Sequence, residues 1–174
     1  SMRDMDYVIT TRELARWAKE QGIDFASLPD GTYDRLMGQA SGAGVIFGNT
    51  GGVMEAALRT AYEFMTREKA PDQLYKLEPV RGYDGIREAS LEIAGMQVNV
   101  AVVYGTANVR RMMERIQKGE KEYHFIEVMT CPGGCIGGGG QPKHLGEDQD
   151  AIRQARISCL YSADERMTLR KSHE

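Results

Sequence analysis

Apolar residues recur along this chain at spacings that predict helices alternating with strands. Residues 7–9 favour an extended strand, and Thr10 and Glu13 then form a T-x-x-E capping box that opens a helix. Gly22 suits the position just after the end of that helix. One side of the helix is mostly apolar and contains Leu14, Trp17, Ala18 and Gln21.

A loop rich in Gly, Asp, Ser and Pro is expected at 28–44. The pattern then predicts a short buried strand at 45–47, a helix at 53–65, a hairpin at 89–105 that turns at Ala94 and Gly95, a helix at 106–120, a strand at 123–131 and a last helix near 149–164. On the last helix, Ile152, Ala155 and Cys159 are expected on the inner side. This order predicts one layered α/β domain over residues 1–174, with a mainly parallel sheet flanked by helices and one antiparallel hairpin.

Composition narrows the classes of protein that this chain can represent. The 174 residues are 41% hydrophobic and 27% charged, and their net charge of -3 gives no electrostatic bias toward nucleic acid or an anionic membrane. No apolar run approaches the roughly 20 residues of a membrane-spanning helix, and the start shows no secretory pattern. We therefore expect a cytoplasmic protein without nucleic-acid or membrane partners.

The segment "CPGGCIGGGGQP", residues 131–142, carries the most distinctive chemistry. Each glycine costs about 0.5–1 kcal/mol of backbone entropy relative to alanine, so this many glycines indicate that the backbone approaches something bulky. Thiolates are soft ligands for iron and zinc, and backbone N–H groups tune iron–sulfur clusters. Cys131 and Cys135 are therefore the candidate metal ligands.

A four-ligand zinc site needs two further Cys or His side chains. We expect His124 within a strand, His144 in a polar loop and His173 at a frayed end, while Cys159 is expected to be a small buried residue of the last helix. The residues alone thus indicate two metal ligands and no third.

A second glycine-rich loop, "FGNTGG" at 47–52, precedes a predicted helix. It is compatible with a tight turn, or with an anion site in which bare backbone N–H groups bind phosphate. It lacks the Lys-Ser/Thr ending of a P-loop and the full spacing of a dinucleotide fingerprint.

Several segments together resemble the catalytic domain of iron-only (FeFe) hydrogenases, which interconvert protons, electrons and molecular hydrogen. "EVMTCPGGCIGGGGQP" is similar to the family's third cluster-binding signature, which is highly specific. Four further segments resemble the family in the expected order: "YVITTRELARWAKEQGIDF", "GAGVIFGNTGGVMEAALRTAYE", "YHFIEV" and "LYSADERMTLRKSHE". The resemblance covers the chain from Asp4 onward.

The resemblance implies a particular site between two lobes of the catalytic domain. Its cofactor would be a four-iron four-sulfur cubane joined to a diiron unit with carbonyl, cyanide and dithiolate ligands. Cys131 and Cys135 would bind the cubane, and the Cys135 sulfur would also bridge to the diiron unit. Met129 would line the diiron pocket, and Phe47 with Gly48 would form another wall.

The chain also departs from the family pattern. The family's first and second signatures, with two further cubane cysteines, a proton-donating cysteine and a lysine, have no counterpart here. Thr130 and Asn49 stand where alanine is usual. We therefore expect the C-terminal lobe of a hydrogenase, inactive alone, whose partners are the missing N-terminal lobe and an electron carrier such as ferredoxin.

Two other functions stay open at this point. One is an iron–sulfur scaffold or redox sensor that binds a cluster between two chains, and the other is a phosphate- or nucleotide-binding module that uses residues 48–52. We further expect that the lobe folds without metal, that its site face drives formation of a homo-oligomer, and that in air Cys131 and Cys135 can form a disulfide.

Overall fold

The computed structural model describes residues 5–32 and 40–174, so part of the expected loop at 28–44 lies outside the described residues. The helices are α1 (Thr11–Glu20), α2 (Gly42–Ile46), α3 (Gly52–Thr66), α4 (Thr106–Gln117) and α5 (Gln149–Arg166). The strands are β1 (Ile86–Ile93), β2 (Met96–Tyr104) and β3 (Phe125–Met129). Short 3-10 turns, η1 to η4, lie at Phe25–Ser27, Asp72–Tyr75, Glu78–Val80 and Cys135–Gly137.

The three strands form one mixed sheet in the order β1-β2-β3. β1 and β2 are the expected hairpin, and their turn places both Ala94 (φ 52°) and Gly95 (φ 76°) in the left-handed region that tight two-residue hairpins need. β2 and β3 are parallel, with α4 connecting them. The expectation of a mainly parallel sheet is confirmed only in part, because one of the two strand pairings in this sheet is parallel and the hairpin supplies the other, antiparallel one.

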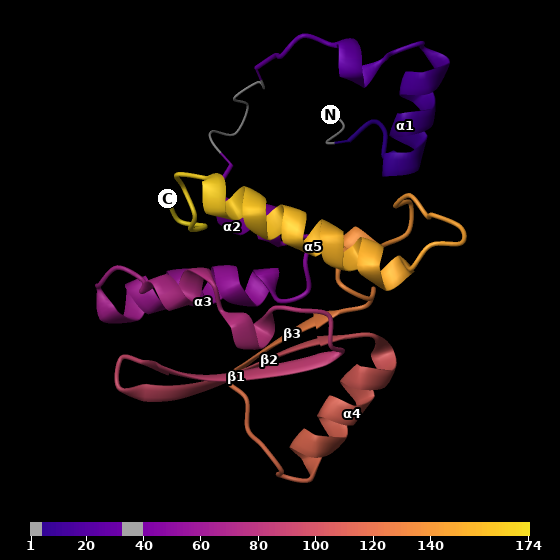
Figure 1. Cartoon of the computed structure of the whole chain (residues 1–174). Helices are drawn as coiled ribbons and strands as arrows, with labels where there is room; N and C mark the ends of the chain where they lie inside the picture. Colours follow the sequence, from indigo (N-terminus) through magenta and orange to yellow (C-terminus); the bar gives the residue numbers. More distant parts are fainter. Residues whose placement is uncertain (1–4, 33–39) are drawn as a thin grey trace.

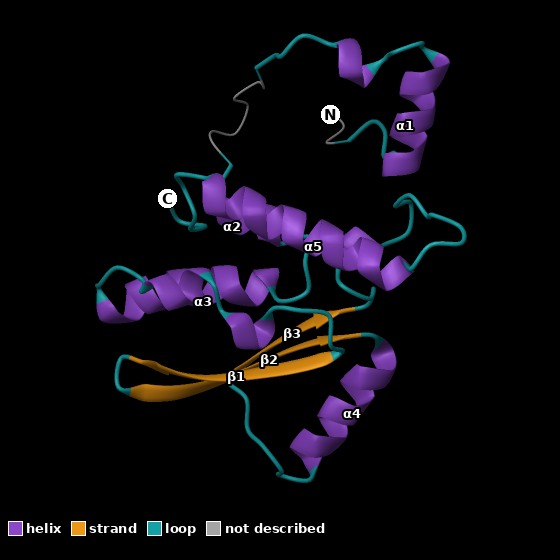
Figure 2. Ribbon diagram, viewed as in Figure 1, coloured by secondary structure: helices purple, strands orange, loops and turns teal. Residues whose placement is uncertain are grey.

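Helices cover both faces of the sheet, so the central strand is buried on both sides. α3 lies over one face and α4 over the other, and α5 with α2 forms a further layer on α3 (Figures 1 and 2). The core between α3 and the sheet includes Met54, Leu58, Val80 and Val100. A second core joins α2, α3 and α5 and includes Ala43, Ile46, Ala56, Ile157 and Tyr161. These cores form the layered α/β arrangement that the sequence predicts.

The start of the chain forms the expected helix but not the expected strand. Thr10 Oγ1 accepts from Glu13 N, and a Glu13 carboxylate oxygen accepts from Thr10 N, which confirms the capping box of α1. Residues 7–9 belong to none of the three strands of the sheet. On α1, Trp17 is 59% exposed, and of the apolar residues on this face only Ala18 is buried. A segment with strand propensity forms a strand, and an apolar helix face is buried, only where another part of the protein packs against it.

Residues 45–47 are also not a strand. Gly42–Ile46 is a short helix, capped by Ser41 Oγ, which accepts from Gly44 N at 3.3 Å, and Phe47 follows it. A short continuous apolar run fits a buried helix as well as a buried strand, and periodicity does not separate the two.

The inner face of α5 differs from the predicted one. Ile157, Tyr161 and Asp164 are buried, whereas Ala155 and Cys159 are exposed. The spacing of apolar residues predicted the wrong side of the helix, because the side that is buried includes an aspartate. Within the described parts of the chain, no helix combines the length and the apolar character needed to cross a bilayer.

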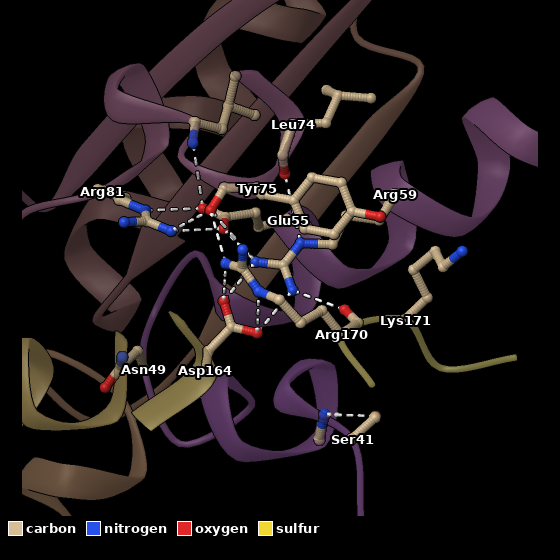
Figure 3. Close-up of polar contacts among 12 residues, drawn as sticks. Ser41, Asn49, Glu55, Arg59, Leu74, Tyr75, Arg81, Asp164, Arg170 and Lys171 are labelled. Carbon is tan, nitrogen blue, oxygen red and sulfur yellow. Dashed lines mark hydrogen bonds and ion pairs between the residues drawn. The ribbon is translucent and has the colours of Figure 1, made fainter. Parts of the chain in front are cut away.

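A buried network of ion pairs joins α3, the segment just after η3, and the end of α5 with the residues that follow it. Arg59 Nη2 lies 2.6 Å from Glu55 Oε1 and 2.8 Å from Asp164 Oδ2. Arg81 Nη2 binds the same Glu55 oxygen at 2.6 Å, and Arg170 Nη2 binds Asp164 Oδ2 at 2.6 Å (Figure 3). These five side chains, here called the ion network, connect three parts of the fold that are distant in sequence.

Candidate metal centre

Two glycine-rich loops that are far apart in sequence lie against each other. The first, residues 47–52, connects α2 to α3, and the second, residues 130–142, follows β3. Thr50 N donates to Gly133 O at 3.0 Å, and Ile136 N donates to Gly48 O at 3.3 Å. The fold therefore brings together the two loops that the sequence singles out, and we call them the FGNTGG loop and the cysteine loop.

Close packing between these loops explains part of the glycine content. Gly134 has φ +97°, and a Cβ atom there would lie 2.6 Å from Gly48 O and 2.7 Å from Thr50 N. The sequence predicts a close approach to something bulky, and at Gly134 that neighbour is the FGNTGG loop. A Cβ atom at Gly139, by contrast, would have no atom within 4 Å beyond its chain neighbours. Packing within the chain therefore does not explain Gly139.

The two cysteine thiols are free and accessible. Cys131 is half-buried and Cys135 is exposed. Their backbone carbonyls are occupied, since Gly134 N donates to Cys131 O and Gly138 N donates to Cys135 O, each at 3.0 Å. These turns fix the backbone at both cysteines while leaving the sulfur atoms unpaired, an arrangement that suits metal ligands.

The other expected site residues lie on the FGNTGG loop or at the end of β3. Met129 ends β3, and its Sδ lies 3.7 Å from Thr50 Oγ1 of the FGNTGG loop. Phe47 is 45% exposed, and Gly48 is hydrogen-bonded to the cysteine loop as described. These three residues are uncharged, and the cysteine loop is also held by Arg156, whose guanidinium donates to Ile136 O at 2.9 Å and to Pro142 O at 2.8 Å.

The start of α3 is already occupied by a carboxylate of the chain itself. Glu127 Oε1 accepts from Gly51 N at 2.6 Å, and Oε2 accepts from Met54 N at 2.7 Å. Glu127 is buried; burial raises its pKa, and the two amide hydrogen bonds and nearby Arg87 only partly offset this effect. The phosphate-binding interpretation of the FGNTGG loop therefore loses two of the amide donors on which it depends.

Sequence reasoning missed Glu127, although the sequence contains a signal for it. The strand segment "YHFIEV" is otherwise largely apolar, and on a strand residues 125, 127 and 129 lie on one face. A single carboxylate on such a strand indicates a buried polar partner elsewhere. Sequence alone does not identify that partner, which lies more than 70 residues earlier in the chain.

The four side chains considered as further zinc ligands have other surroundings: the three histidines contact other residues, and Cys159 is exposed. His124 Nδ1 accepts from Asn99 N, and His144 Nδ1 lies 3.7 Å from Glu147. His173 does not fray: its ring contacts Phe64 and Glu63 of α3. Cys159 is exposed on α5, not buried as predicted.

The donor set fits part of an iron–sulfur centre. Within residues 5–32 and 40–174, no group of three or more His, Cys, Asp or Glu side chains could hold a metal ion. A cubane takes four thiolates or their equivalents. Cys131 and Cys135 would supply two of them.

Comparison with known proteins identifies the family of this chain. Residues 1–139 match the family described as iron only hydrogenase large subunit, C-terminal domain. The chain belongs to the iron-only hydrogenase family. "Iron hydrogenase 1" of Clostridium pasteurianum is 51% identical over 175 residues, and the "Periplasmic [Fe] hydrogenase large subunit" of Nitratidesulfovibrio vulgaris is 55% identical over 141 residues. These alignments cover 99% and 81% of this chain.

The structural comparison agrees with the sequence comparison. A variant of the [FeFe]-hydrogenase HydA1 from Chlamydomonas reinhardtii superposes with a TM-score of 0.75 at 42% identity, covering 98% of this chain and 49% of that one. The "Cytosolic Fe-S cluster assembly factor narfl" of Xenopus tropicalis is a more distant relative of this chain, at 33% identity over 164 residues, or 92% of this chain. The chain spans 30% and 33% of the length of the two bacterial hydrogenases.

Proposed function

We propose that this chain forms one side of an iron-only hydrogenase active site and that Cys131 and Cys135 bind its cluster. The observation that carries this proposal is the pair of free thiols on a loop held against the FGNTGG loop. A cubane joined to a diiron unit would supply the redox chemistry that interconverts protons, electrons and hydrogen. The other cubane ligands would come from an N-terminal lobe outside these 174 residues.

The chain's own residues would hold and shield that cofactor. Cys131 would hold the cubane, and Cys135 would hold both the cubane and the diiron unit. Met129, Phe47 and Gly48 would surround the diiron unit with uncharged groups that exclude water. The exposure of Phe47 supports this role, because a large apolar side chain at a loop surface suits a position that a cofactor and a second lobe cover.

The partners and location of the complete protein follow from the same proposal. Electron transfer requires a carrier such as ferredoxin, and we propose that the protein acts in the cytoplasm. In the absence of the second lobe, the exposed site face would drive self-association of the chain. The single domain over residues 1–174 would then be a lobe that is stable by itself, because its two hydrophobic cores do not include the cysteines.

A chimera tests the proposed function directly. In it, this chain replaces the matching 30% of Iron hydrogenase 1, and the product is matured and assayed for hydrogen evolution. We expect activity in the chimera and its loss in Cys131→Ser and Cys135→Ser. Cys159→Ser is the matched control and should retain activity, because Cys159 lies exposed on α5. Full activity of Cys135→Ser would contradict the proposal.

One observation favours a second candidate function, an iron–sulfur scaffold that shares a cluster between two chains. The family includes a relative named as a cytosolic Fe-S cluster assembly factor, and the chain offers two thiols in one loop. Such a scaffold would bind iron as a dimer and would produce no hydrogen. Sedimentation of the anaerobically reconstituted chain, with its iron content, distinguishes the two functions.

A further inference from the structure

The Glu127 side chain connects β3, the strand that leads into the cysteine loop, to the end of the FGNTGG loop and the start of α3. It belongs to β3, two residues before Met129 and four before Cys131. Its two carboxylate oxygens reach Gly51 N and Met54 N, at 2.6 and 2.7 Å, where the FGNTGG loop becomes α3. The side chain is 5% exposed, so water does not compete for these bonds.

This contact is more than a helix cap of the usual local kind. A side-chain cap normally comes from the residue just before the helix, but here that residue is Gly51, which has no side chain. The cap instead crosses between segments more than 70 residues apart. Hydrogen bonds from backbone amides to a carboxylate are charge-assisted and short, so this tie is strong compared with the neutral bonds that join the two loops directly. Arg156 holds the cysteine loop from the side of α5, through Ile136 O at 2.9 Å and Pro142 O at 2.8 Å.

The other contacts between the loops are weaker or longer. They are the backbone bonds Thr50 N to Gly133 O at 3.0 Å and Ile136 N to Gly48 O at 3.3 Å, and the Thr50–Met129 contact at 3.7 Å. We call the contact between the two loops, together with the bonds of Glu127, the seam. Glu127 lies at one end of the seam, and both cysteines lie toward its other end.

We propose that Glu127 is a positioning residue that fixes the cysteine loop against the FGNTGG loop and thereby sets the accessibility and direction of the Cys131 and Cys135 thiols. The proposal deepens the proposed function, because it assigns the residue that prearranges the two ligands. It predicts that the thiols change their behaviour when the carboxylate is altered, even with no metal bound.

Thiol reactivity in the 174-residue chain tests this role without any cluster. Under native, reducing conditions each cysteine is alkylated with iodoacetamide, and its rate is followed by peptide mass spectrometry. In the unaltered chain Cys131 should react more slowly than Cys135, because it is half-buried and Cys135 is exposed. Cys159, which is exposed on α5, is an internal reference.

Glu127→Gln keeps the size of the side chain but leaves only one oxygen for two amide donors. We expect amide hydrogen exchange at Gly51 or Met54 to become about tenfold faster, and alkylation of Cys131 to rise by roughly the same factor. The Cys159 rate should stay unchanged. Glu122→Gln is the matched control, since Glu122 is exposed and lies just before β3, and it should change none of these rates.

Each result decides the proposal. If hydrogen exchange at Gly51 and Met54 accelerates while Cys131 and Cys135 keep their rates, Glu127 is only a cap for α3 and the proposal is overturned. If Glu127→Gln unfolds, as far-UV circular dichroism would show, Glu127→Asp decides by the same readout. Unfolding of both variants would make Glu127 a general stability residue and would also overturn the proposal. None of these outcomes depends on hydrogen evolution, so the proposed function is tested separately.

Discussion

The ion network and the cysteine loop are both polar assemblies of distant segments, but only the first is complete within the chain. In the ion network Glu55 and Asp164 are fully buried, and each has two guanidinium partners (Figure 3). In the cysteine loop the backbone is hydrogen-bonded to its neighbour, but both thiols are free. The difference separates what this chain needs in order to fold from what it needs in order to act.

This comparison predicts that the stability of the chain resides in the ion network and the two cores, and that the metal site adds little until a cofactor binds. A buried charge without a partner is costly, whereas an exposed thiol costs almost nothing. Changes in the first region should therefore alter folding, and changes at the thiols should alter metal binding.

The largest effect is expected from breaking the ion network. Arg59→Met removes a guanidinium that is completely buried between Glu55 and Asp164, so both carboxylates lose a partner. We expect the free energy of unfolding to fall by about 3–5 kcal/mol, measured by urea denaturation. The control is Lys76→Met, whose exposed pair with Glu78 spans 3.6 Å and should contribute less than about 1 kcal/mol. Equal losses of stability in the two variants would contradict the claim that the buried ion network stabilises the fold more than an exposed ion pair does.

The next effect concerns the seam between the loops. Gly134→Ala would place a Cβ atom 2.6 Å from Gly48 O at a φ of +97°. We expect a loss of about 1–3 kcal/mol in unfolding free energy and slower cofactor incorporation in the chimera. Gly139→Ala is the control, because its Cβ would have no atom within 4 Å beyond its chain neighbours. If Gly134→Ala were as stable as the parent, the loops would not pack as described.

A smaller effect on stability, which should depend on pH, is expected at Glu63 of α3, outside the ion network. Glu63 accepts from Ala70 N and from Lys171 and His173, and these partners, led by the Ala70 amide, lower its pKa to about 2. Its folded pKa is below the unfolded value of 4.5, so its contribution is full above pH 4.5 and disappears as pH falls toward 2.

Glu63→Gln measures this contribution. At pH 7 the variant should be less stable than the parent by about 1 kcal/mol, since the site is partly open to solvent. Between pH 4.5 and pH 2 the two stability curves should converge, as urea titrations at each pH would show. A difference that persisted unchanged at pH 2 would assign the loss to packing instead of charge.

The smallest effect is expected for Asn49→Ala in the FGNTGG loop. Asn49 is fully buried, and its Nδ2 donates to Ile157 O at 3.4 Å, but within the described residues its Oδ1 has no hydrogen-bond donor. Loss of a weak bond and relief of an unsatisfied oxygen nearly cancel, so thermal unfolding should indicate a change within about 1 kcal/mol. A larger loss of stability would mean that the Asn49 side chain contributes more to folding than its one weak hydrogen bond indicates.

Local patterns predicted much of the fold. The capping box at Thr10, the hairpin turn at Ala94 and Gly95, and helix α3 depend on neighbouring residues, and the structure confirms them. The strand predicted at 45–47 and the inner face predicted for α5 are wrong, because each depends on what packs against the segment. A buried Asp164 opposite Arg59 is not visible in the spacing of apolar residues.

The candidate site shows the same limit. The sequence identified both glycine loops and both thiols, since a motif states which residue types are present. It did not show that the loops contact each other, nor that Glu127 occupies the amides at the start of α3. Both facts arise from the way the parallel strand β3 is placed beside α3, which only the tertiary structure determines.

The most direct test of the central claim is the iron content of this chain alone. The 174-residue protein is reconstituted anaerobically with iron and sulfide, separated by gel filtration, and assayed for iron, labile sulfide and hydrogen evolution. Because Cys131 and Cys135 would supply only two thiolates, we predict no hydrogen evolution and no intact cubane on a single chain. About four irons per monomer together with hydrogen evolution would contradict the claim that the site needs a second lobe.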